Sequence, residues 1–264
     1  MSTPNVSFII VEFHSLEDIN KCIASLKAAS IYGSYEIIVS SNSCYPQEKQ
    51  AQLKKNYTDV SWSFNPKNGG FAYAMNQGMK LAQGNYLTIL NPDVCIKHGI
   101  DQMIRFMNDH PKVGAIAPQI VSPKGVTQDS ARPYVTLQSY VWRCLKRVIE
   151  KKTAVLDTHM DYNQVQTVDW VIGAFMMVRR AVYENTQGMD ENYFMYAEDL
   201  DWCTRIRKCG YEIVYYPLAQ VEYEGSRSAR QSMKYARIFL QSHFYYWRKH
   251  GFFYGHPKRQ PLFE

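Results

Sequence analysis

The first 121 residues alternate between short apolar segments and patterns typical of amphipathic helices. Short buried segments that alternate with helices are typical of parallel strands joined by crossover helices. The apolar segments are Val6–Phe13, Tyr35–Ser40, Val60–Phe64, Asn85–Leu90 and Val113–Val121. The resulting order, βαβαβαβαβ, predicts a Rossmann-like, mostly parallel central sheet with helices on both faces.

The remaining sequence extends this sheet and then changes in composition. Thr167–Arg180 predicts two strands around a Gly-Ala break, and a helix is expected before Gly210. Two last strands are expected at Tyr211–Pro217 and Ala219–Glu224. Residues 122–166 are less regular and read as a variable insertion. We therefore expect one α/β domain over residues 1–224 and a C-terminal helical tail over residues 225–264.

Asp190–Arg205, called the acidic segment below, holds five carboxylates among aromatic side chains. Burial against apolar rings disfavours the ionised form, which raises the pKa of a carboxyl group toward the range useful for proton transfer. The segment is therefore a candidate functional site. Within it, Asp201 and Arg205 stand four residues apart, where we expect an ion pair on a helix. Glu191 either shapes the site or caps a loop.

Polar side chains follow three of the predicted strands: Glu12 with His14, Ser41 to Ser43, and Asn91 to Asp93. In open α/β sheets, ligands bind beyond the carboxyl ends of the strands. Glu12 and Asn42 could therefore contact a nucleotide, and Asp93 could bind its diphosphate through Mg²⁺ or Mn²⁺, which prefer oxygen donors. Asn-Pro-Asp is also a good generic turn sequence, so a purely structural role stays open.

The segment from Asn68 to Gly84 begins with two glycines, in the sequence NGGFAYAMNQG. Glycines permit a ligand to approach the backbone closely, and the N-terminus of the helix that follows favours anions. The segment lacks both the Gly-Lys-Ser/Thr of a P-loop and the GxGxxG of nicotinamide-binding proteins. Neither of those ligand classes is expected.

Four motifs in order carry a resemblance to a known family: NGGFAYAMNQG, YLTILNPD, VDWVIGAFMMVRR and MDENYFMYAEDLDWCTRIRKCGYEIVYYP. Together they resemble the family-two inverting glycosyltransferases of the GT-A fold, in the bacterial rhamnosyltransferase-like branch. The resemblance spans roughly residues 5–250. It implies transfer of a sugar from a nucleotide donor to a saccharide acceptor on a lipid carrier, in surface polysaccharide synthesis, with residues 1–224 as the catalytic domain.

The resemblance also implies roles for individual residues. Glu198 and Asp199 match the acidic pair that supplies the base, and we place the base on Asp199 because inverting transfer needs one proton acceptor. Asp93 matches the metal-binding end of a DxD-type motif, which implies Mg²⁺ or Mn²⁺ as cofactor. The nucleotide-sugar side is expected to include Asn68, Gly70, Asn76 and Asn91. The acceptor and sugar side is expected to include Trp170, Gly173, Ala174 and Glu191.

Three residues depart from the family pattern. Ser41 stands where an Asp usually meets the pyrimidine base, and Tyr223 stands where a His is common. Glu12 replaces an Asn and could substitute as a ribose or base contact. The favoured donor is dTDP-rhamnose, and the alternative is a UDP-sugar carrying galactofuranose or an N-acetylhexosamine. A catalytically inactive scaffold in polysaccharide assembly is the hypothesis from another class.

The tail carries most of the excess positive charge. Residues 225–264 hold eight Lys or Arg against Glu264 alone, in a chain whose formal net charge is +6. A stripe at helical spacing runs through this tail: Tyr235, Ile238, Phe239, Ser242, Tyr245 and Tyr246. The helix either packs on the domain with a charged outer face or lies on anionic lipid headgroups. No nucleic-acid-binding module is recognised, so nucleic acid is not an expected partner.

The N-terminal sequence, MSTPNVSFIIVEF, lacks the basic leader and small-residue cleavage site of a signal peptide. No apolar run approaches the roughly 18 residues that a membrane-spanning helix needs. We therefore expect a cytoplasmic protein, with peripheral contact at the inner face of the cell membrane if the tail binds lipid.

Overall fold

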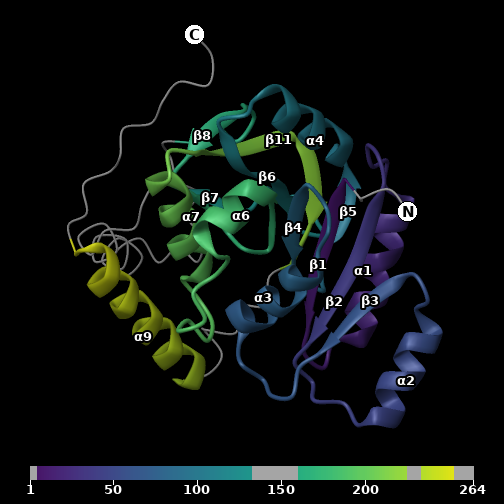
Figure 1. Cartoon of the computed structure of the whole chain (residues 1–264). Helices are drawn as coiled ribbons and strands as arrows, with labels where there is room; N and C mark the ends of the chain where they lie inside the picture. Colours follow the sequence, from purple (N-terminus) through teal and green to yellow (C-terminus); the bar gives the residue numbers. More distant parts are fainter. Residues whose placement is uncertain (1–4, 133–159, 225–232, 253–264) are drawn as a thin grey trace.

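The computed structural model describes residues 5–132, 160–224 and 233–252 (Figure 1). Within them a nine-stranded sheet has the order β3-β2-β1-β4-β10-β6-β11-β5, and β8 also pairs with β11. Its strands are β1 (Val6–Glu12), β2 (Tyr35–Ser41), β3 (Val60–Phe64), β4 (Tyr86–Leu90), β5 (Cys95–His98), β6 (Val113–Val121), β8 (Gln166–Val168), β10 (Phe175–Arg179) and β11 (Glu212–Glu222). A second, two-stranded sheet pairs β7 (Ala131–Arg132) with β9 (Trp170–Val171).

The half of the sheet formed by β3, β2, β1 and β4 is parallel, as the sequence predicts. All seven residues of β1 are buried, which is expected of a parallel strand covered on both faces. The other half is mixed, because β10 runs antiparallel between β4 and β6. The carboxyl ends of β1, β2 and β4 consequently lie at the same edge of the sheet.

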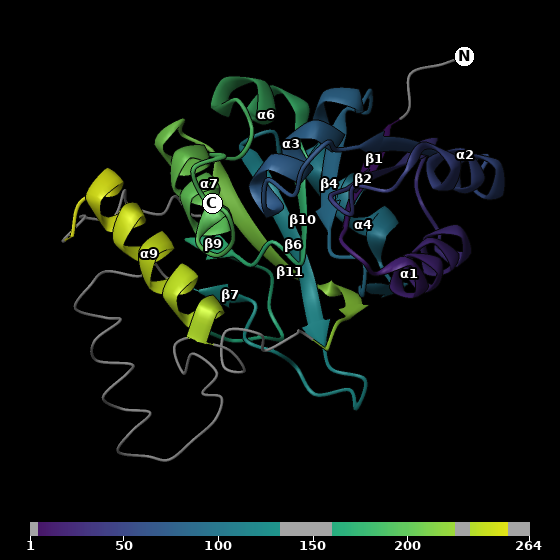
Figure 2. The same ribbon diagram turned by 90° about the horizontal axis from the view of Figure 1, so that it is seen from below.

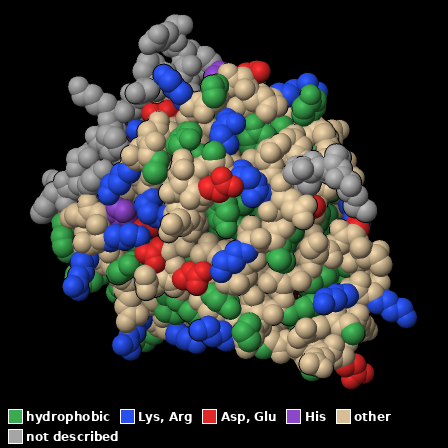
Figure 3. Space-filling model, in the orientation of Figure 1, with side chains coloured by type: hydrophobic (Ala, Val, Ile, Leu, Met, Phe, Trp, Pro, Cys, Tyr) green, Lys and Arg blue, Asp and Glu red, His purple; other side chains and the backbone are tan. Residues whose placement is uncertain are grey.

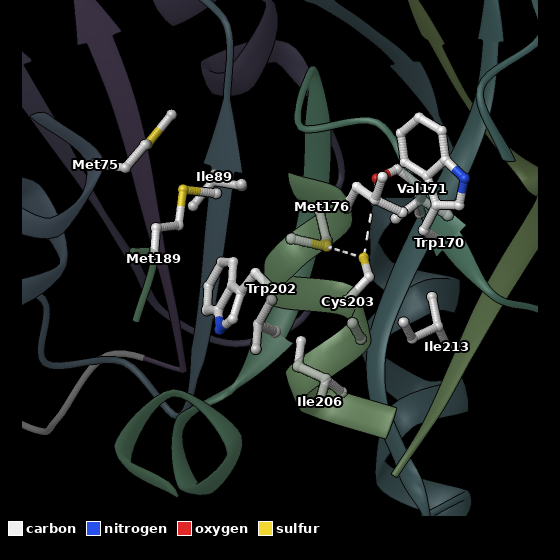
Figure 4. Packing of buried hydrophobic residues seen from close by; sticks show 14 of the residues in the cluster. Met75, Ile89, Trp170, Val171, Met176, Met189, Trp202, Cys203, Ile206 and Ile213 are labelled. Carbon is white, nitrogen blue, oxygen red and sulfur yellow. Dashed lines mark hydrogen bonds between the residues drawn. The ribbon is translucent and has the colours of Figure 1, made fainter. Parts of the chain in front are cut away.

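Helices cover both faces of this sheet. One apolar cluster joins the sheet to α1 (Leu16–Ala28), α2 (Gln47–Asn56) and α4 (Ile100–Asp109). The other joins it to α3 (Phe71–Leu81), α6 (Arg180–Thr186) and α7 (Glu198–Lys208). Figure 4 shows α7 in this second cluster, where Trp202 and Ile206 face the core and the sulfur of Cys203 lies 3.8 Å from that of Met176.

Three elements differ from the sequence-based prediction. β5 is a separate strand after the Asn-Pro-Asp turn, where a helix was expected. α4 begins only after Gly99, whose φ of 85° reverses the chain between the strand and the helix. α6 was not predicted, because its seven residues directly follow a strand without a turn signal. The two last predicted strands form one strand, β11, whose register shifts between Tyr216 and Gln220 instead of ending there.

The tail forms one helix over the part that the structure describes, α9 (Met233–His250). It lies beside α7 in both ribbon views (Figures 1 and 2). The predicted helical extension is thereby confirmed for these residues, while 225–232 and 253–264 fall outside the described residues. Of the predicted insertion, only residues 122–132 and 160–166 are described. Among the described helices, none has the length and apolar character required to cross a membrane.

Candidate active site

Asp199 lies at the start of α7 and faces the Gly-Ala break before β10. Its Oδ2 accepts a hydrogen bond of 2.8 Å from the Gly173 N–H, and its Oδ1 accepts one of 2.7 Å from the Leu200 N–H. The side chain is half-buried. Burial raises the pKa of Asp199, although these two N–H groups oppose the shift. The arrangement fixes a carboxylate in one orientation while keeping its affinity for a proton high.

Glu198 is the buried member of the acidic pair. It is only 7% exposed, and its Oε2 has no hydrogen-bond partner among the described residues. Burial and the adjacent charge of Asp199 raise the pKa of Glu198 to about 8. The two carboxyl groups therefore titrate together, and proton uptake belongs to the pair. Because Asp199 is the more exposed of the two, it is the one that an incoming hydroxyl group can reach.

The turn before α7 has an unusual backbone. Tyr196 and Ala197, with φ of 69° and 64°, are consecutive non-glycine residues in the left-handed region. Such residues cost about 1–3 kcal/mol each and persist where the surrounding structure holds them. They turn the chain so that Glu198 and Asp199 occupy the first turn of α7, where the helix dipole favours carboxylates.

The Asn91–Asp93 turn lies next to this pair. The Asn91 N–H donates to the Ala174 carbonyl at 3.0 Å, and its side-chain amide donates to the Tyr223 hydroxyl at 2.9 Å. Burial and the neighbouring carboxylates of Asp93 and Asp199 raise the pKa of Tyr223 to about 12. Tyr223, one of the three residues that depart from the family pattern, thus lies within electrostatic range of both the proposed base and the proposed metal ligand.

Asp93 is half-buried, and burial together with the charge of Asp18 raises its pKa. A carboxylate destabilised in this way would gain from a cation beside it. Among the described residues, no three His, Cys, Asp or Glu side chains gather as a metal-binding group. Phosphate oxygens and water are the donors that Mg²⁺ usually adds to one or two carboxylates.

Glu12 is completely buried and is surrounded by hydroxyl groups. It accepts hydrogen bonds from Ser41 Oγ at 2.5 Å, from Ser43 Oγ at 2.9 Å and from Tyr45 Oη at 3.1 Å. The expected direct contact between Glu12 and a nucleotide is not supported by this geometry, since both carboxylate oxygens are occupied. The carboxylate instead orients three hydroxyl groups at the ends of β1 and β2.

A chain of amides follows the ends of β2 and β3. The Asn65 amide donates to Asn42 Oδ1, and the Asn42 amide donates to Asn68 Oδ1 and to the Gly70 carbonyl. Asn42 is 2% exposed, whereas Asn68 is exposed. Of Asn42 and Asn68, both predicted to contact the nucleotide, Asn68 is the one whose side chain a ligand can reach.

Gly70 has the special backbone that the sequence predicts, but with a different neighbour. Its φ is 92°, and a Cβ atom there would lie 2.2 Å from the Phe194 carbonyl oxygen. The adjacent Phe71 N–H donates to the same oxygen at 2.8 Å. The backbone of the acidic segment therefore occupies the space beside Gly70 where a ligand was expected. The Phe71 N–H at the start of α3 is hydrogen-bonded to this backbone.

Asn76 is also placed differently from the expectation. Its amide donates to the Met189 carbonyl at 2.8 Å and to Glu191 Oε1 at 2.9 Å, and its Oδ1 accepts from the Met189 N–H at 2.9 Å. These contacts join α3 to the acidic segment. Both N–H groups of the Asn76 amide are bound within the protein and cannot donate to a nucleotide. Asn76 holds Glu191, the predicted acceptor-side residue, in position.

Sequence reasoning missed one cation at the site, Arg132. Its guanidinium lies 5.4 Å from the ring centre of Trp170 and 2.8 Å from Asp129, and its charge lowers the pKa of Asp199. The strand pair β7–β9 sets Arg132 opposite Trp170. The only sequence signal was a basic residue at the edge of an irregular region, which does not distinguish it from other surface arginines.

Solved structures with the same fold are glycosyltransferases. GalNAc-T7 with UDP, GalNAc and Mn²⁺ superimposes with a TM-score of 0.63 at 14% identity, covering 84% of this chain and 43% of that one. The mannosyltransferase PcManGT from Pyrobaculum calidifontis, in complex with GDP-Man and Mn²⁺, gives 0.62 at 17% identity, covering 100% and 68%. At these identities the likeness concerns the fold, and it confirms the predicted GT-A architecture.

Two relatives are similar in sequence. Rhamnosyltransferase WbbL of Escherichia coli K12 is 27% identical over 225 residues, 80% of each chain. An N-acetylglucosaminyl-diphospho-decaprenol L-rhamnosyltransferase of Mycobacterium tuberculosis is 30% identical over 149 residues, 54% of this chain. This chain spans about half the length of the mycobacterial relative, namely 48%. Residues 7–186 match glycosyl transferase family 2, and the chain belongs to that family.

Proposed function

We propose that the protein is an inverting transferase that moves rhamnose from a nucleotide donor to a saccharide on a lipid carrier. The names of the two relatives support rhamnose and, for the mycobacterial protein, a lipid-linked acceptor. The observation that carries the mechanism is the carboxylate of Asp199, half-exposed and oriented by two backbone N–H groups. The acidic pair lies beyond the matched residues 7–186, so this assignment rests on the motif resemblance together with this geometry.

In the proposed step, Asp199 accepts the proton of the acceptor hydroxyl as its oxygen attacks the anomeric carbon. The new C–O bond forms while the bond to the diphosphate breaks, and the nucleoside diphosphate leaves with the bonding electrons. A single carboxylate is enough for this displacement. A retaining path through a covalent sugar would need a second one as nucleophile. Glu198 is too buried for that role, and burial together with the charge of Asp199 raises the pKa of Glu198 to about 8.

Asp93 is the residue that would hold Mg²⁺ or Mn²⁺, together with phosphate oxygens of the donor. When bound, the metal would supply positive charge to the departing diphosphate. A bound cation would stabilise the half-buried carboxylate of Asp93, whose pKa is raised by burial and by the charge of Asp18. Asn91, expected on the nucleotide-sugar side, donates its side-chain N–H to the Tyr223 hydroxyl. It positions the turn that carries Asp93.

The remaining site residues divide between two sides. On the nucleotide side we assign Asn68 as a contact, while Glu12 and Asn42 orient the hydroxyls and backbone around it. On the acceptor side we assign Trp170 and Arg132, whose charge suits an anionic group such as a diphosphate on the carrier. We also assign Gly173, Ala174 and Glu191 as residues that line the acceptor side. Such an acceptor places the protein at the inner face of the cell membrane.

A transfer assay tests the proposal. Purified protein is incubated with dTDP-rhamnose, or with UDP-sugars in parallel, plus a lipid-linked disaccharide and Mn²⁺. Asp199→Asn should lower the turnover about 10²–10⁴-fold, because it removes the proton acceptor while keeping the shape. Asp109→Asn, at an exposed aspartate, is the matched control. Turnover of Asp199→Asn at the wild-type rate would contradict the base assignment, and turnover of UDP-sugars alone would replace the donor. Absence of any transfer would favour the scaffold.

A further inference from the structure

The inner face of α9 is fastened to the acidic segment and to α7. Ser242 Oγ donates to the Met195 carbonyl at 2.8 Å, and the Tyr246 hydroxyl lies 2.9 Å from that of Thr204. The aromatic stripe predicted from the sequence belongs to this face, and its members are buried or half-buried. This stripe is therefore the packing face, and it cannot be the surface that meets a lipid headgroup.

A different stripe of α9 points to solvent. Met233, Leu240 and Phe244 are 91%, 59% and 56% exposed. Arg237 and Arg248 are exposed as well. These five positions follow one another at intervals of three or four residues, so they share one side of the helix. We call them the outer face of α9. Large apolar side chains so exposed require an explanation, because water contact with them is unfavourable.

The Lys and Arg side chains of α9 are not balanced by carboxylates on the same helix. α9 contains no Asp or Glu, and residues 225–264 hold eight basic residues against one acidic residue. In Figure 3, Lys and Arg side chains line the left edge of the molecule, the side on which α9 lies in Figure 1. Protruding Leu, Met and Phe between arginines is the pattern of a helix that lies in a lipid–water interface. Anionic headgroups complement the charge and the acyl region accommodates the apolar side chains.

The inner face of α9 places this helix beside the site. The Phe239 ring lies 5.5 Å from that of Tyr196, which directly precedes Ala197 and the acidic pair. We propose that the outer face of α9 docks on an anionic lipid bilayer and holds the acceptor side of the active site at its surface. This inference rests on the proposed function in one respect, the lipid-linked acceptor. The docking itself needs no substrate.

Co-sedimentation with vesicles tests the docking without donor or acceptor. Wild-type protein should bind vesicles of phosphatidylglycerol and phosphatidylcholine and should not bind phosphatidylcholine alone. Leu240→Glu/Phe244→Glu should weaken binding at least tenfold, since it removes two apolar side chains and adds two negative charges. Leu218→Glu/Val126→Glu is the control, because these residues are 55% and 62% exposed on other elements. Arg237→Gln/Arg248→Gln should weaken binding about fivefold per residue.

The outcomes separate docking from catalysis. Unchanged sedimentation of the Leu240/Phe244 variant, with its thermal unfolding midpoint at the wild-type value, would overturn the proposal. Equal binding to phosphatidylcholine would overturn the anionic requirement, and loss of binding in the Leu218/Val126 control would show a nonspecific effect of charge. Transfer to a short-chain, water-soluble acceptor should be the same for wild type and for the three double variants. If even wild type lacks transfer while vesicle binding persists, the proposed function fails and the docking stands.

Discussion

The carboxylate of Asp201 offers the sharpest test of how this fold is held together. It is completely buried at the junction of α7 and α9. It accepts bonds of 2.7 Å from Arg205 Nε, Lys249 Nζ and His250 Nε2. The ion pair with Arg205 was predicted from sequence and is confirmed. Lys249 and His250 come from α9, so the same carboxylate joins two helices.

Asp201→Asn keeps the size of this side chain and removes its charge. Removing one partner from a buried ion network costs about 3–5 kcal/mol of unfolding free energy, because the other charges remain desolvated. Asp59→Asn is the matched control. Asp59 forms an equally short pair with Lys27, at 2.6 Å, but the two side chains are 52% and 47% exposed. An exposed pair of this kind contributes under about 1 kcal/mol.

Urea unfolding of the three proteins measures both effects. Asp201→Asn should lower the unfolding free energy by at least about 2 kcal/mol more than Asp59→Asn does, from the difference between the buried and exposed values. Equal losses in the two variants would show that the network is not stabilising and would refute the reasoning. Because α9 is attached partly through Asp201, limited proteolysis should also cut the tail of Asp201→Asn sooner than that of the control.

The pH dependence of this difference has a definite sign. Burial alone would raise the pKa of Asp201, but its partners His250, Arg205 and Lys249 hold it well below its ordinary value. The group therefore stabilises the fold above the unfolded-state pKa of about 3.9 and loses this contribution as the pH falls toward the folded-state value. The contribution of the Asp201 carboxylate to the gap between wild type and Asp201→Asn should narrow below about pH 4.

Three further variants probe the site. Gly173→Ala should leave stability unchanged, because its Cβ would lie at 3.4 Å from the Cβ of Asp199, but it should lower kcat/KM by crowding the acceptor; unchanged kinetics would contradict this. Gly70→Ala should cost more than about 2 kcal/mol in urea unfolding, from left-handed strain plus a backbone clash, whereas Gly125→Ala, with φ of 74° and open space, should cost only the strain of about 1 kcal/mol. Arg132→Gln should raise the pKa of Asp199 and shift the acidic limb of the kcat/KM profile to higher pH, and an unmoved limb would sink that coupling.

The parallel half of the sheet could be predicted from the sequence because its strands are buried on both faces. Apolar runs such as that of β1 need no knowledge of distant residues, and the structure ends this strand one residue before the predicted end. β4 ends at Leu90, as predicted from the sequence. This end places Asn91 and Asp93 at the carboxyl edge of the sheet. Local patterns therefore located the edge at which the candidate site lies.

The partners of individual residues could not be predicted, because they are set by contacts between distant segments. Asn76 and Met189 are 113 positions apart, yet they exchange two hydrogen bonds. Gly70 was correctly singled out for its backbone, but nothing local indicates that Phe194 is its neighbour. Arg132 became visible as a site residue only when β7 paired with β9. In each case the residue type determines which interactions are possible, and the tertiary structure determines which residue is the partner.

The five carboxylates of the acidic segment separate according to what holds them. Asp190 and Asp201 both bind Lys249 of α9, each at 2.7 Å, and Glu191 binds Asn76 of α3. These three fasten the segment on both sides. Burial raises the pKa of the remaining two, Glu198 and Asp199, whereas cationic partners lower the pKa values of Asp190 and Asp201. Because the fastening residues flank the acidic pair, contacts with α3 and α9 hold the backbone on both sides of the proposed base.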